Sequence, residues 1–439
     1  MEILIKVIQL FMSLSLLVAI HEFGHFIAAR LFGIRVEKFY IFFDPWFSIF
    51  KFKRGDTEYG LGWIPLGGYV KIAGMIDESL DTEQMKQPVK PDEFRAKPAW
   101  QRFLVMIAGV VMNLLLAFVI YCGISYTWGS SYLANEDIRW GYSFNETGHD
   151  LGFADGDKVI SIDGKKIDNV NEIMNMLVLS DKDRQVLVER NGMPFRITIP
   201  YDKLLEMRNN ESYADLYTPR VPMMVHEITE PKAAKAGLAV GDIILGVNGT
   251  QVIDAAKVRE MLKQYSGQRV TVDVERGNNI MSLDMPVDAE GRIEFLATSP
   301  ITLRTQKYSF WESIPAGARL TGRVISNYWQ QLKMIVKPQT EMYKNLGGFI
   351  AIGNIFPSEW NWQQFWFTTA FLSIILAIMN IIPIPGLDGG HSLFTLWEMI
   401  TGRKPSDRFL EIAQYIGLLL ILALLIYANG NDIYRFFIK

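Results

Sequence analysis

Two histidines and a glutamate interrupt a strongly apolar run near the start of the chain, LVAIHEFGHFIAARLF at residues 17–32. His21 and His25 are four residues apart, and on a helix this spacing places both imidazoles on one face, with Cβ atoms about 5–6 Å apart. Two such imidazoles can bind one tetrahedral Zn²⁺, as in the HExxH motif, and Glu22 follows the first of them, within reach of a water on that ion. The stretch therefore indicates a zinc site.

Burial inside an apolar segment makes this interpretation stronger. An ionisable group there costs about 2.5–3.5 kcal/mol even on a lenient insertion scale, and such groups usually mark functional sites. The alternative is a chance match, in which the histidines only satisfy hydrogen bonds in a core. The chain has five histidines, and two of them fall at this spacing within one apolar segment, which favours the metal site.

A catalytic zinc site usually has a third protein ligand and one open position. The best match is Asp388, in NIIPIPGLDGGH at the end of a later apolar segment, and His391 in the same stretch is the rival. Pro383 and Gly386 favour a break in the helix there, which would let the chain turn the Asp388 carboxylate inward. The alternative for Asp388 is a carboxylate at a helix end that faces water.

Four segments reach or approach the roughly 20 apolar residues that cross a bilayer. They cover residues 3–32, 103–124, 365–384 and 412–427. No small-residue cleavage site follows the first, so we expect a spanning helix there rather than a signal peptide. The chain has 439 residues and a formal net charge of -3, without the basic excess of a nucleic-acid-binding protein. We therefore expect an integral protein of the lipid bilayer and no nucleic-acid partner.

Basic residues in the short connections predict the orientation of these segments. The stretch from Arg30 to Arg102 has twelve Lys or Arg, and the connection between the third and fourth segments adds Arg403, Lys404 and Arg408. Both connections should face the cytoplasm. The long region between the second and third segments should then lie on the opposite face of the membrane, with the zinc site toward the cytoplasmic side.

Two stretches of that long region repeat at a constant offset of 85 residues, GFADGDKVISIDGKKI and GLAVGDIILGVNGTQV. Asp157 recurs as Asp242, and a two-residue hairpin turn recurs at residues 163–164 and 248–249. A repeat at fixed spacing indicates duplicated domains. The second copy resembles a PDZ domain of the bacterial protease type, and the first does so more weakly. PDZ domains typically add an extended peptide to a sheet edge, and the alternative is a rigid spacer or size filter without a peptide.

The stretches AIHEFGHFIAARLFGI and NIIPIPGLDGGH together resemble the site-2 protease family of intramembrane zinc metalloproteases. Two PDZ-like copies between the second and third segments are similar to the arrangement in its regulator of sigma-E protease branch. Matched position by position, the resemblance implies His21, His25 and Asp388 as ligands of one Zn²⁺ per chain and Glu22 as the catalytic acid/base. It favours Asp388 over His391 as the third ligand.

Further matches concern substrate binding. Residues 54–75 are similar to the membrane-associated β-hairpin region of the family, and Gly67 and Gly68 suit an exposed edge that pairs with an extended substrate. Asn380 and Asn113 match two family asparagines. Both are substrate-binding candidates that would hydrogen-bond an unwound backbone, or else they hold helices together, for about 0.6 kcal/mol. Helix packing is the slightly favoured role of Asn113.

The chain departs from the family pattern at three places. Residues 42–45 read Phe-Phe-Asp-Pro where Gly-Phe-Gly-Pro is common, and Val110 and Phe349 each stand where a proline is common. None of these positions is a proposed ligand. The departures therefore bear on loop geometry and substrate preference rather than on the chemistry.

The predicted fold is a multi-pass α-helical membrane protein with four transmembrane helices, a membrane-associated β-hairpin region and two inserted PDZ-like α+β domains. The first part comprises a transmembrane helix with HExxH at 1–33, a cytoplasmic loop with the hairpins at 34–100, a transmembrane helix at 101–127 and PDZ-like domains at 128–215 and 216–300. The second part comprises amphipathic or linker helices at 301–360, a transmembrane helix with the LDG motif at 361–388, a cytoplasmic loop at 389–407, a transmembrane helix at 408–429 and a tail at 430–439. Residues 310–336 form an amphipathic pattern, suited either to the membrane interface or to packing against the PDZ-like domains.

The resemblance implies hydrolysis of a peptide bond in or near the transmembrane segment of a single-span membrane protein, such as an anti-sigma factor, in regulated intramembrane proteolysis. The PDZ-like pair would contact a peptide or the ectodomain of that substrate. One alternative is a non-catalytic PDZ membrane scaffold with a structural metal site, which has no need of a general base such as Glu22. A second alternative is an ion transporter, which needs more polar residues along the spans than the sequence shows.

Overall fold

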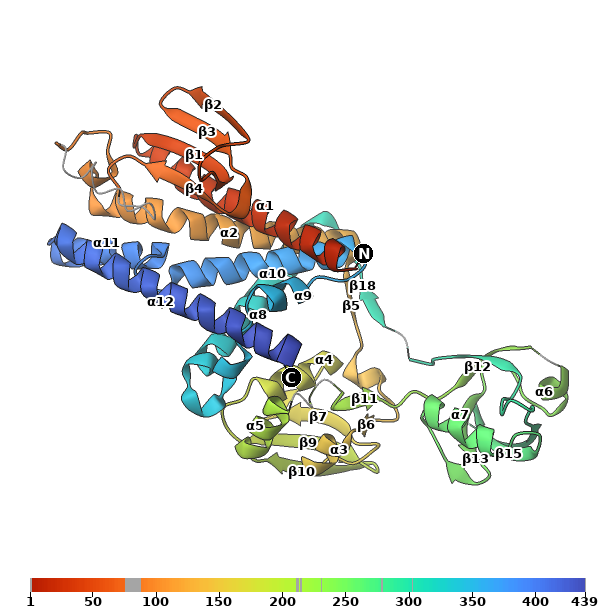
Figure 1. The fold of residues 1–439 in the computed structure, drawn as a ribbon. Helices are drawn as coiled ribbons and strands as arrows, with labels where there is room; N and C mark the ends of the chain where they lie inside the picture. Colours follow the sequence, from red (N-terminus) through yellow and green to blue (C-terminus); the bar gives the residue numbers. More distant parts are fainter. Residues whose placement is uncertain are drawn as a thin grey trace. The chain divides into compact units, whose positions relative to one another are not determined.

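The computed structural model describes residues 2–75, 88–210, 213, 215–229, 231–277, 279–301 and 303–438. Part of the predicted cytoplasmic loop, residues 76–87, lies outside these described residues. The chain divides into two compact units (Figure 1). The helical unit comprises Met1–Gly129, Lys307–Pro338 and Met342–Lys439, and the β-rich unit comprises Ser130–Gln306 and Gln339–Glu341.

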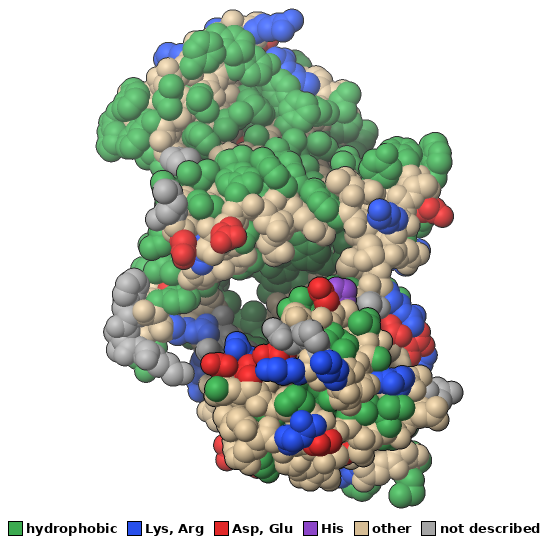
Figure 2. Space-filling model, turned by 90° about the vertical axis from the view of Figure 1, so that its right-hand side faces the viewer, with side chains coloured by type: hydrophobic (Ala, Val, Ile, Leu, Met, Phe, Trp, Pro, Cys, Tyr) green, Lys and Arg blue, Asp and Glu red, His purple; other side chains and the backbone are tan. Residues whose placement is uncertain are grey.

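Among the described residues, four helices are long and apolar enough to cross a membrane. They are α1 (Glu2–Leu31), α2 (Ala99–Trp128), α10 (Trp362–Ile381) and α12 (Asp407–Ile433). Most of the side chains along α1 and α12 are not buried within the protein, although they are apolar. On the face drawn in Figure 2, hydrophobic side chains accordingly cover much of the helical unit. Such a surface is stable in lipid, as expected for the helices of a membrane protein.

Helix α2 is the centre of the helical unit, because α1, α10, α11 (Asp388–Thr401) and α8 (Phe310–Val336) all pack against it. A Cβ atom added at Gly24 of α1 would lie 2.5 Å from the carbonyl oxygen of Ala108, so the two backbones approach closely there. Small residues permit this kind of close helix contact in membranes. On another face of α2, Tyr121 and its neighbours form a buried apolar cluster with α10 and α8.

The amphipathic segment 310–336 is helix α8, which packs against α2 and α10. It belongs to the helical unit, where Cys122 of α2 places its Sγ 3.8 Å from the carbonyl oxygen of Ile314. A Cβ added at Gly317 would lie 2.5 Å from the same sulfur, so the helices touch closely. Helix α8 therefore packs along the membrane helices, and Trp311, 77% exposed, points outward.

The helix is interrupted between α10 and α11, as Pro383 and Gly386 predict. Helix α10 ends at Ile381, and Gly386 has a φ of +92°, which excludes a continuous helix. The chain re-enters a helix at Asp388, and α11 continues to Thr401, where we expected a loop from 389 to 407. Apolar residues at helical spacing in HSLFTLWEMIT explain the difference. Helix α11 ends at Gly402, a left-handed C-cap whose N–H bonds the Glu398 carbonyl at 2.8 Å.

A four-stranded sheet follows α1, with strand order β2-β3-β1-β4. Its strands are β1 (Val36–Phe43), β2 (Phe50–Arg54), β3 (Thr57–Leu61) and β4 (Ile64–Ile72). Strands β2 and β3 form a hairpin, but β1 pairs parallel with β3 and antiparallel with β4. Gly67 and Gly68 lie in β4, which is an edge strand of this sheet as described. A Cβ added at Gly68 would lie 3.0 Å from Val18 Cγ1, so this edge strand runs beside α1, three residues before His21.

The β-rich unit has two lobes, each with its own hydrophobic core. The first has the sheet β10-β9-β7-β8 and the second has the sheet β16-β15-β13-β12-β17, with β14 paired to β13. The first lobe comprises β6 (Tyr142–Phe144), α3 (Glu146–Asp150), β7 (Lys158–Ile162), β8 (Lys165–Lys166), α4 (Val170–Val178), β9 (Arg184–Arg190), β10 (Met193–Ile199), α5 (Tyr201–Asn209) and β11 (Tyr217–Pro219). The second comprises β12 (Met224–Ile228), α6 (Pro231–Lys235), β13 (Ile243–Val247), β14 (Thr250–Gln251), α7 (Ala255–Gln264), β15 (Arg269–Arg276), β16 (Asn279–Pro286) and β17 (Phe295–Thr298). Strands β5 (Ser130–Tyr132) and β18 (Arg304–Gln306), at the two ends of the segment, pair with each other.

The same ion pair, formed by a buried aspartate and a partly exposed arginine, recurs in both lobes. Asp157 accepts hydrogen bonds from Nε and Nη2 of Arg190, both at 2.7 Å, and Asp242 accepts the equivalent bonds from Arg276 at the same lengths. The side chains of both aspartates are fully buried. The repeated aspartates of the sequence therefore hold the same place in two related folds, and their arginine partners extend the repeat beyond the matched stretches.

Burial acts to raise the pKa of Asp242, but the hydrogen bonds from Arg276 and from the Ala239 N–H outweigh it and hold this pKa below its usual range. Asp242→Asn should destabilise the second lobe by about 2 kcal/mol at pH 7, because it removes a charged hydrogen-bonded pair. The contribution of Asp242 is complete above the ordinary carboxyl pKa of about 3.9 and is lost as pH falls through the lower folded value. The difference between wild type and variant should therefore shrink in acid. Urea denaturation of the full chain, with proteolysis used to follow the second lobe, measures this difference in stability.

Asp284→Asn is the matched control. Asp284 pairs with Arg269 at 2.7 Å in the same sheet, but its side chain is 65% exposed. Exposed pairs contribute at most about 1 kcal/mol, so this variant should change little. Equal effects of the two substitutions would show that the buried pair has no special role.

Candidate metal centre

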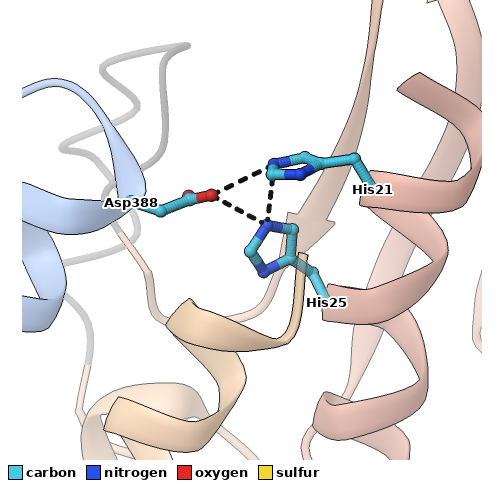
Figure 3. Close-up of side chains that lie close together, drawn as sticks. All are labelled: His21, His25 and Asp388. Atoms are coloured by element: carbon cyan, nitrogen blue, oxygen red, sulfur yellow. Dashed lines mark hydrogen bonds and ion pairs between the residues drawn. The ribbon is translucent and has the colours of Figure 1, made fainter. Parts of the chain in front are cut away.

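His21, His25 and Asp388 come together in the helical unit, although Asp388 is more than 360 residues from the two histidines (Figure 3). His21 Nε2 lies 3.3 Å from His25 Nε2 and 3.0 Å from Asp388 Oδ2. His25 Nε2 lies 3.3 Å from the same carboxylate oxygen. Three atoms that can each donate an electron pair to a metal thus face one point.

Two elements supply these side chains. Helix α1 places His21 and His25 one turn apart on a buried face. The non-helical segment before α11 makes Asp388 the first residue of that helix. The side chains of the two histidines are 10% and 8% exposed, and that of Asp388 is 19% exposed. Protein therefore encloses most of the surface of all three side chains.

The geometry of the three donor atoms suits zinc. Bonds of roughly 2.0–2.2 Å at tetrahedral angles place neighbouring ligand atoms about 3.3–3.6 Å apart. The three measured separations, 3.0, 3.3 and 3.3 Å, are close to the edges of one tetrahedral face. Two imidazoles and one carboxylate also form a known catalytic zinc set that leaves the fourth position open for substrate or water. The residues present therefore fit the ion.

Helix α2 provides the surroundings of both imidazoles. The carbonyl oxygen of Val105 accepts a hydrogen bond from His25 Nδ1 at 2.8 Å, which leaves the lone pair of Nε2 directed at the site. Asn113 places its Nδ2 3.1 Å from His21 Nδ1. Between them, Gly109 lies against both rings, since a Cβ added there would be 2.5 Å from His25 Nε2 and 2.6 Å from His21 Cε1.

The structure places the other predicted site residues as follows. Asn380, at the end of α10, points into the site with Nδ2 3.3 Å from His21 Nε2. Glu22 is half-buried next to His21 and lies near enough to His25 to interact with it electrostatically. His391 is one turn after Asp388 on α11 and is outside the three-residue group found in the described part of the chain. Gly67 and Gly68 lie on strand β4 beside α1 rather than at the three donor atoms.

Sequence reasoning missed Val105 and Gly109. The backbone carbonyl of Val105 has no sequence signal, because any residue there carries the same group. Gly109 had one, since a glycine four residues before Asn113 in an apolar helix indicates close contact with a neighbouring element.

A model of peptidase family M50 matches residues 9–424, nearly the whole chain. The chain belongs to peptidase family M50. It is 31% identical over 448 residues to the regulator of sigma E protease of Haemophilus influenzae, covering 96% of this chain and 97% of that protein. It is 28% identical over 466 residues to the regulator of sigma-E protease RseP of Salmonella typhimurium, covering 99% and 100%. A Xylella fastidiosa protein with the name of a zinc metalloprotease is 28% identical over 445 residues, covering 96% and 97%.

Family membership and structure agree on the class of the protein. This M50 protein is a zinc metalloprotease, and its apolar helices make it a protein of the membrane. The site-2 protease resemblance carried by HEFGH and LDGG is thereby confirmed.

Gly109→Ala should lower zinc affinity and activity roughly 10–100-fold, the range found when the surroundings of metal ligands are disturbed. The reason is steric, because the added methyl group would occupy the space of both imidazoles. Zinc content and competition with a chelator measure the effect. Gly123→Ala is the control on the same helix, where an added Cβ meets nothing within 4 Å. Normal zinc binding by Gly109→Ala would contradict the close packing of α2 on the two rings.

Proposed function

We propose that this protein hydrolyses a peptide bond in or beside the transmembrane segment of another, single-span membrane protein. In this proposal His21, His25 and Asp388 bind zinc and Glu22 is the catalytic acid/base. The observation that carries it is the convergence of these two histidines and Asp388, at separations that suit zinc, inside a helical unit with an apolar outer surface. A substrate that reaches such a site comes most directly from the lipid.

The chemistry divides between the ion and the side chains. Zinc held by these ligands supplies Lewis-acid chemistry, lowering the pKa of water to about 7 and polarising the scissile carbonyl. Glu22 takes the proton from the attacking water and passes it to the nitrogen of the leaving amine. In this proposal Asn380, whose amide lies 3.3 Å from His21 Nε2, donates a hydrogen bond to the carbonyl oxygen as negative charge develops there.

Strand β4 is the proposed substrate-binding edge. A transmembrane helix hides its carbonyls in its own hydrogen bonds, so the segment has to unwind before it is cut. In lipid each freed backbone group needs a new partner, and an edge strand offers them. The position of Gly68 against Val18 supports this role, because it brings the edge to the helix that carries His21 and His25.

The orientation and the β-rich unit complete the proposal. We place the zinc site toward the cytoplasm and the two lobes in the periplasm, supported by the basic connections of the sequence.

We assign the lobes as PDZ-like domains, supported by their matching Asp-Arg pairs. In the second lobe, strand β12 is paired on both sides, with β13 and with β17, so a peptide cannot be added along this strand. We therefore propose that the second lobe screens substrates by ectodomain size.

The relatives suggest the class of substrate. Those from Haemophilus influenzae and Salmonella typhimurium are named as regulators of sigma E. We therefore propose a membrane-bound anti-sigma factor as the substrate of this protein too, in regulated intramembrane proteolysis at the inner membrane. The scaffold alternative has no observation in its favour, since the chain belongs to a peptidase family and keeps Glu22.

Glu22→Gln should reduce cleavage by about 10²–10⁴-fold, because the amide cannot accept and return a proton. Zinc content should stay the same, since Glu22 is not one of the three donor residues. Cleavage of a membrane peptide by purified protein, with zinc measured on the same sample, tests both expectations. Wild-type cleavage by this variant would refute the assigned role of Glu22. Loss of zinc together with activity would make Glu22 a ligand instead.

Asn380→Asp should lower kcat by about 10²–10³-fold while zinc stays bound, because the carboxylate keeps the shape of the amide but lacks its N–H donors. Stopped-time assays at saturating peptide give kcat, and a chelator competition gives zinc affinity. An effect on KM alone would assign Asn380 to binding of the resting substrate rather than to the transition state. An unchanged kcat and KM would remove it from the site.

A further inference from the structure

The side chain of Asn113 is fully buried, and one of its polar atoms has no partner. Its Nδ2 lies 3.1 Å from His21 Nδ1, while its Oδ1 is buried without a hydrogen bond. A buried, unpaired carbonyl oxygen is unfavourable, so its presence beside the metal centre needs a reason. The carboxamide can exchange the two atoms by a half-turn about its Cβ–Cγ bond, because the oxygen and the NH2 group have nearly the same size.

The two orientations of this amide select different tautomers of His21. With Nδ2 toward the ring, Nδ1 has to accept, and the ring proton stands on Nε2, which faces Asp388 Oδ2 at 3.0 Å. With Oδ1 toward the ring, Nδ1 donates its proton to the amide oxygen, and Nε2 offers its lone pair. A metal binds the lone pair, so only the second tautomer lets Nε2 act as a ligand.

We propose that Asn113 is the positioning residue for His21: its Oδ1 accepts the Nδ1–H and thereby directs the Nε2 lone pair at zinc. This inference rests on the proposed ligand assignment of His21, His25 and Asp388. It gives Asn113 a role in metal binding, in place of the substrate contact or the helix packing expected from the sequence.

The neighbouring histidine supports this role. His25 Nδ1 already donates to the carbonyl oxygen of Val105 at 2.8 Å, so its Nε2 is fixed as the ligand atom. Val105 and Asn113 are eight residues apart on α2, with Gly109 midway, and therefore follow one stripe of the helix at intervals of four. The stripe matches the four-residue spacing of the two histidines on α1. With the Asn113 amide in the proposed orientation, each imidazole thus has its own oxygen acceptor on the same helix.

The enclosure of Asn113 argues against a substrate contact. Its exposed fraction is 0%, and Ser373 of α10, also 0% exposed, donates a hydrogen bond to its backbone oxygen at 2.8 Å. An extended substrate therefore has no access to the amide. Asn380, by contrast, is half-buried and faces Nε2, the metal side of the same ring.

The test is the zinc affinity of full-length protein in detergent, measured by competition with a chromophoric chelator. Asn113→Leu removes the acceptor and should weaken zinc binding 10–100-fold. Asn113→Asp keeps an oxygen acceptor of the same shape and should bind zinc within about threefold of wild type, as in carboxylate–histidine–zinc arrangements. At saturating zinc, the KM of the Leu variant for a membrane peptide should be unchanged. Elution volume and melting temperature check folding, and Asn113→Ala replaces the Leu variant if that one does not fold.

Two controls separate this inference from the proposals on which it rests. Ser373→Ala removes the hydrogen bond to the Asn113 backbone but keeps the amide, and should leave zinc affinity unchanged. His21→Ala should abolish zinc binding, and zinc bound normally by that variant would overturn the ligand assignment itself. Loss of zinc in His21→Ala with wild-type affinity in Asn113→Leu would overturn only the role of Asn113. A raised KM with unchanged zinc affinity would return Asn113 to substrate binding, and failure of Asn113→Asp to restore affinity would reduce it to packing.

Discussion

The burial of two imidazoles and a carboxylate between apolar helices is the constraint on which the rest of this membrane unit depends. In a medium without water every polar atom needs a partner, so the fold has to bring polar groups to both ring nitrogens of His21 and His25. Val105 and Asn113 lie at the Nδ1 atoms, and Asp388 lies at the Nε2 atoms. The close approach of α1 to α2 at Gly24 makes these contacts short enough to form. The helix packing and the site are therefore one arrangement.

Helix α2 meets several requirements at once because its faces differ. One stripe, with Gly109 at its centre, holds the two rings, and the other faces pack against α10, α8 and α11. The buried pair of Arg102 and Glu398 joins α2 to α11, three turns from Asp388. Helix α2 thus packs against both helices that carry the three donor residues, although it provides none of these residues itself. A disturbance along α2 should therefore reach the ligands even when it touches no ligand directly.

Sequence reasoning was most successful where the chemistry is local. The spacing of His21 and His25 needs only helical geometry, and the break before Asp388 needs only proline and glycine, so both followed from short stretches. The parallel pairing of β1 with β3 and the role of Asn113 depend on register between distant segments, which one sequence does not reveal. Helix α11 was missed for another reason. The glycines and prolines before it predict a loop, but the apolar residues at helical spacing after His391 favour a helix.

The position of the sheet against α1 has a consequence for the proposed reaction. Unwinding a substrate helix frees backbone groups in a medium that cannot solvate them, and each net hydrogen bond regained contributes only about 0.5–1.5 kcal/mol. Unwinding is therefore tolerable where several new bonds form together, as they do along a strand. Gly68 of the edge strand lies against Val18, and Val18 is one turn before His21. Strand pairing and bond cleavage can then act on the same short stretch of substrate, so that the segment need unwind only where it is cut.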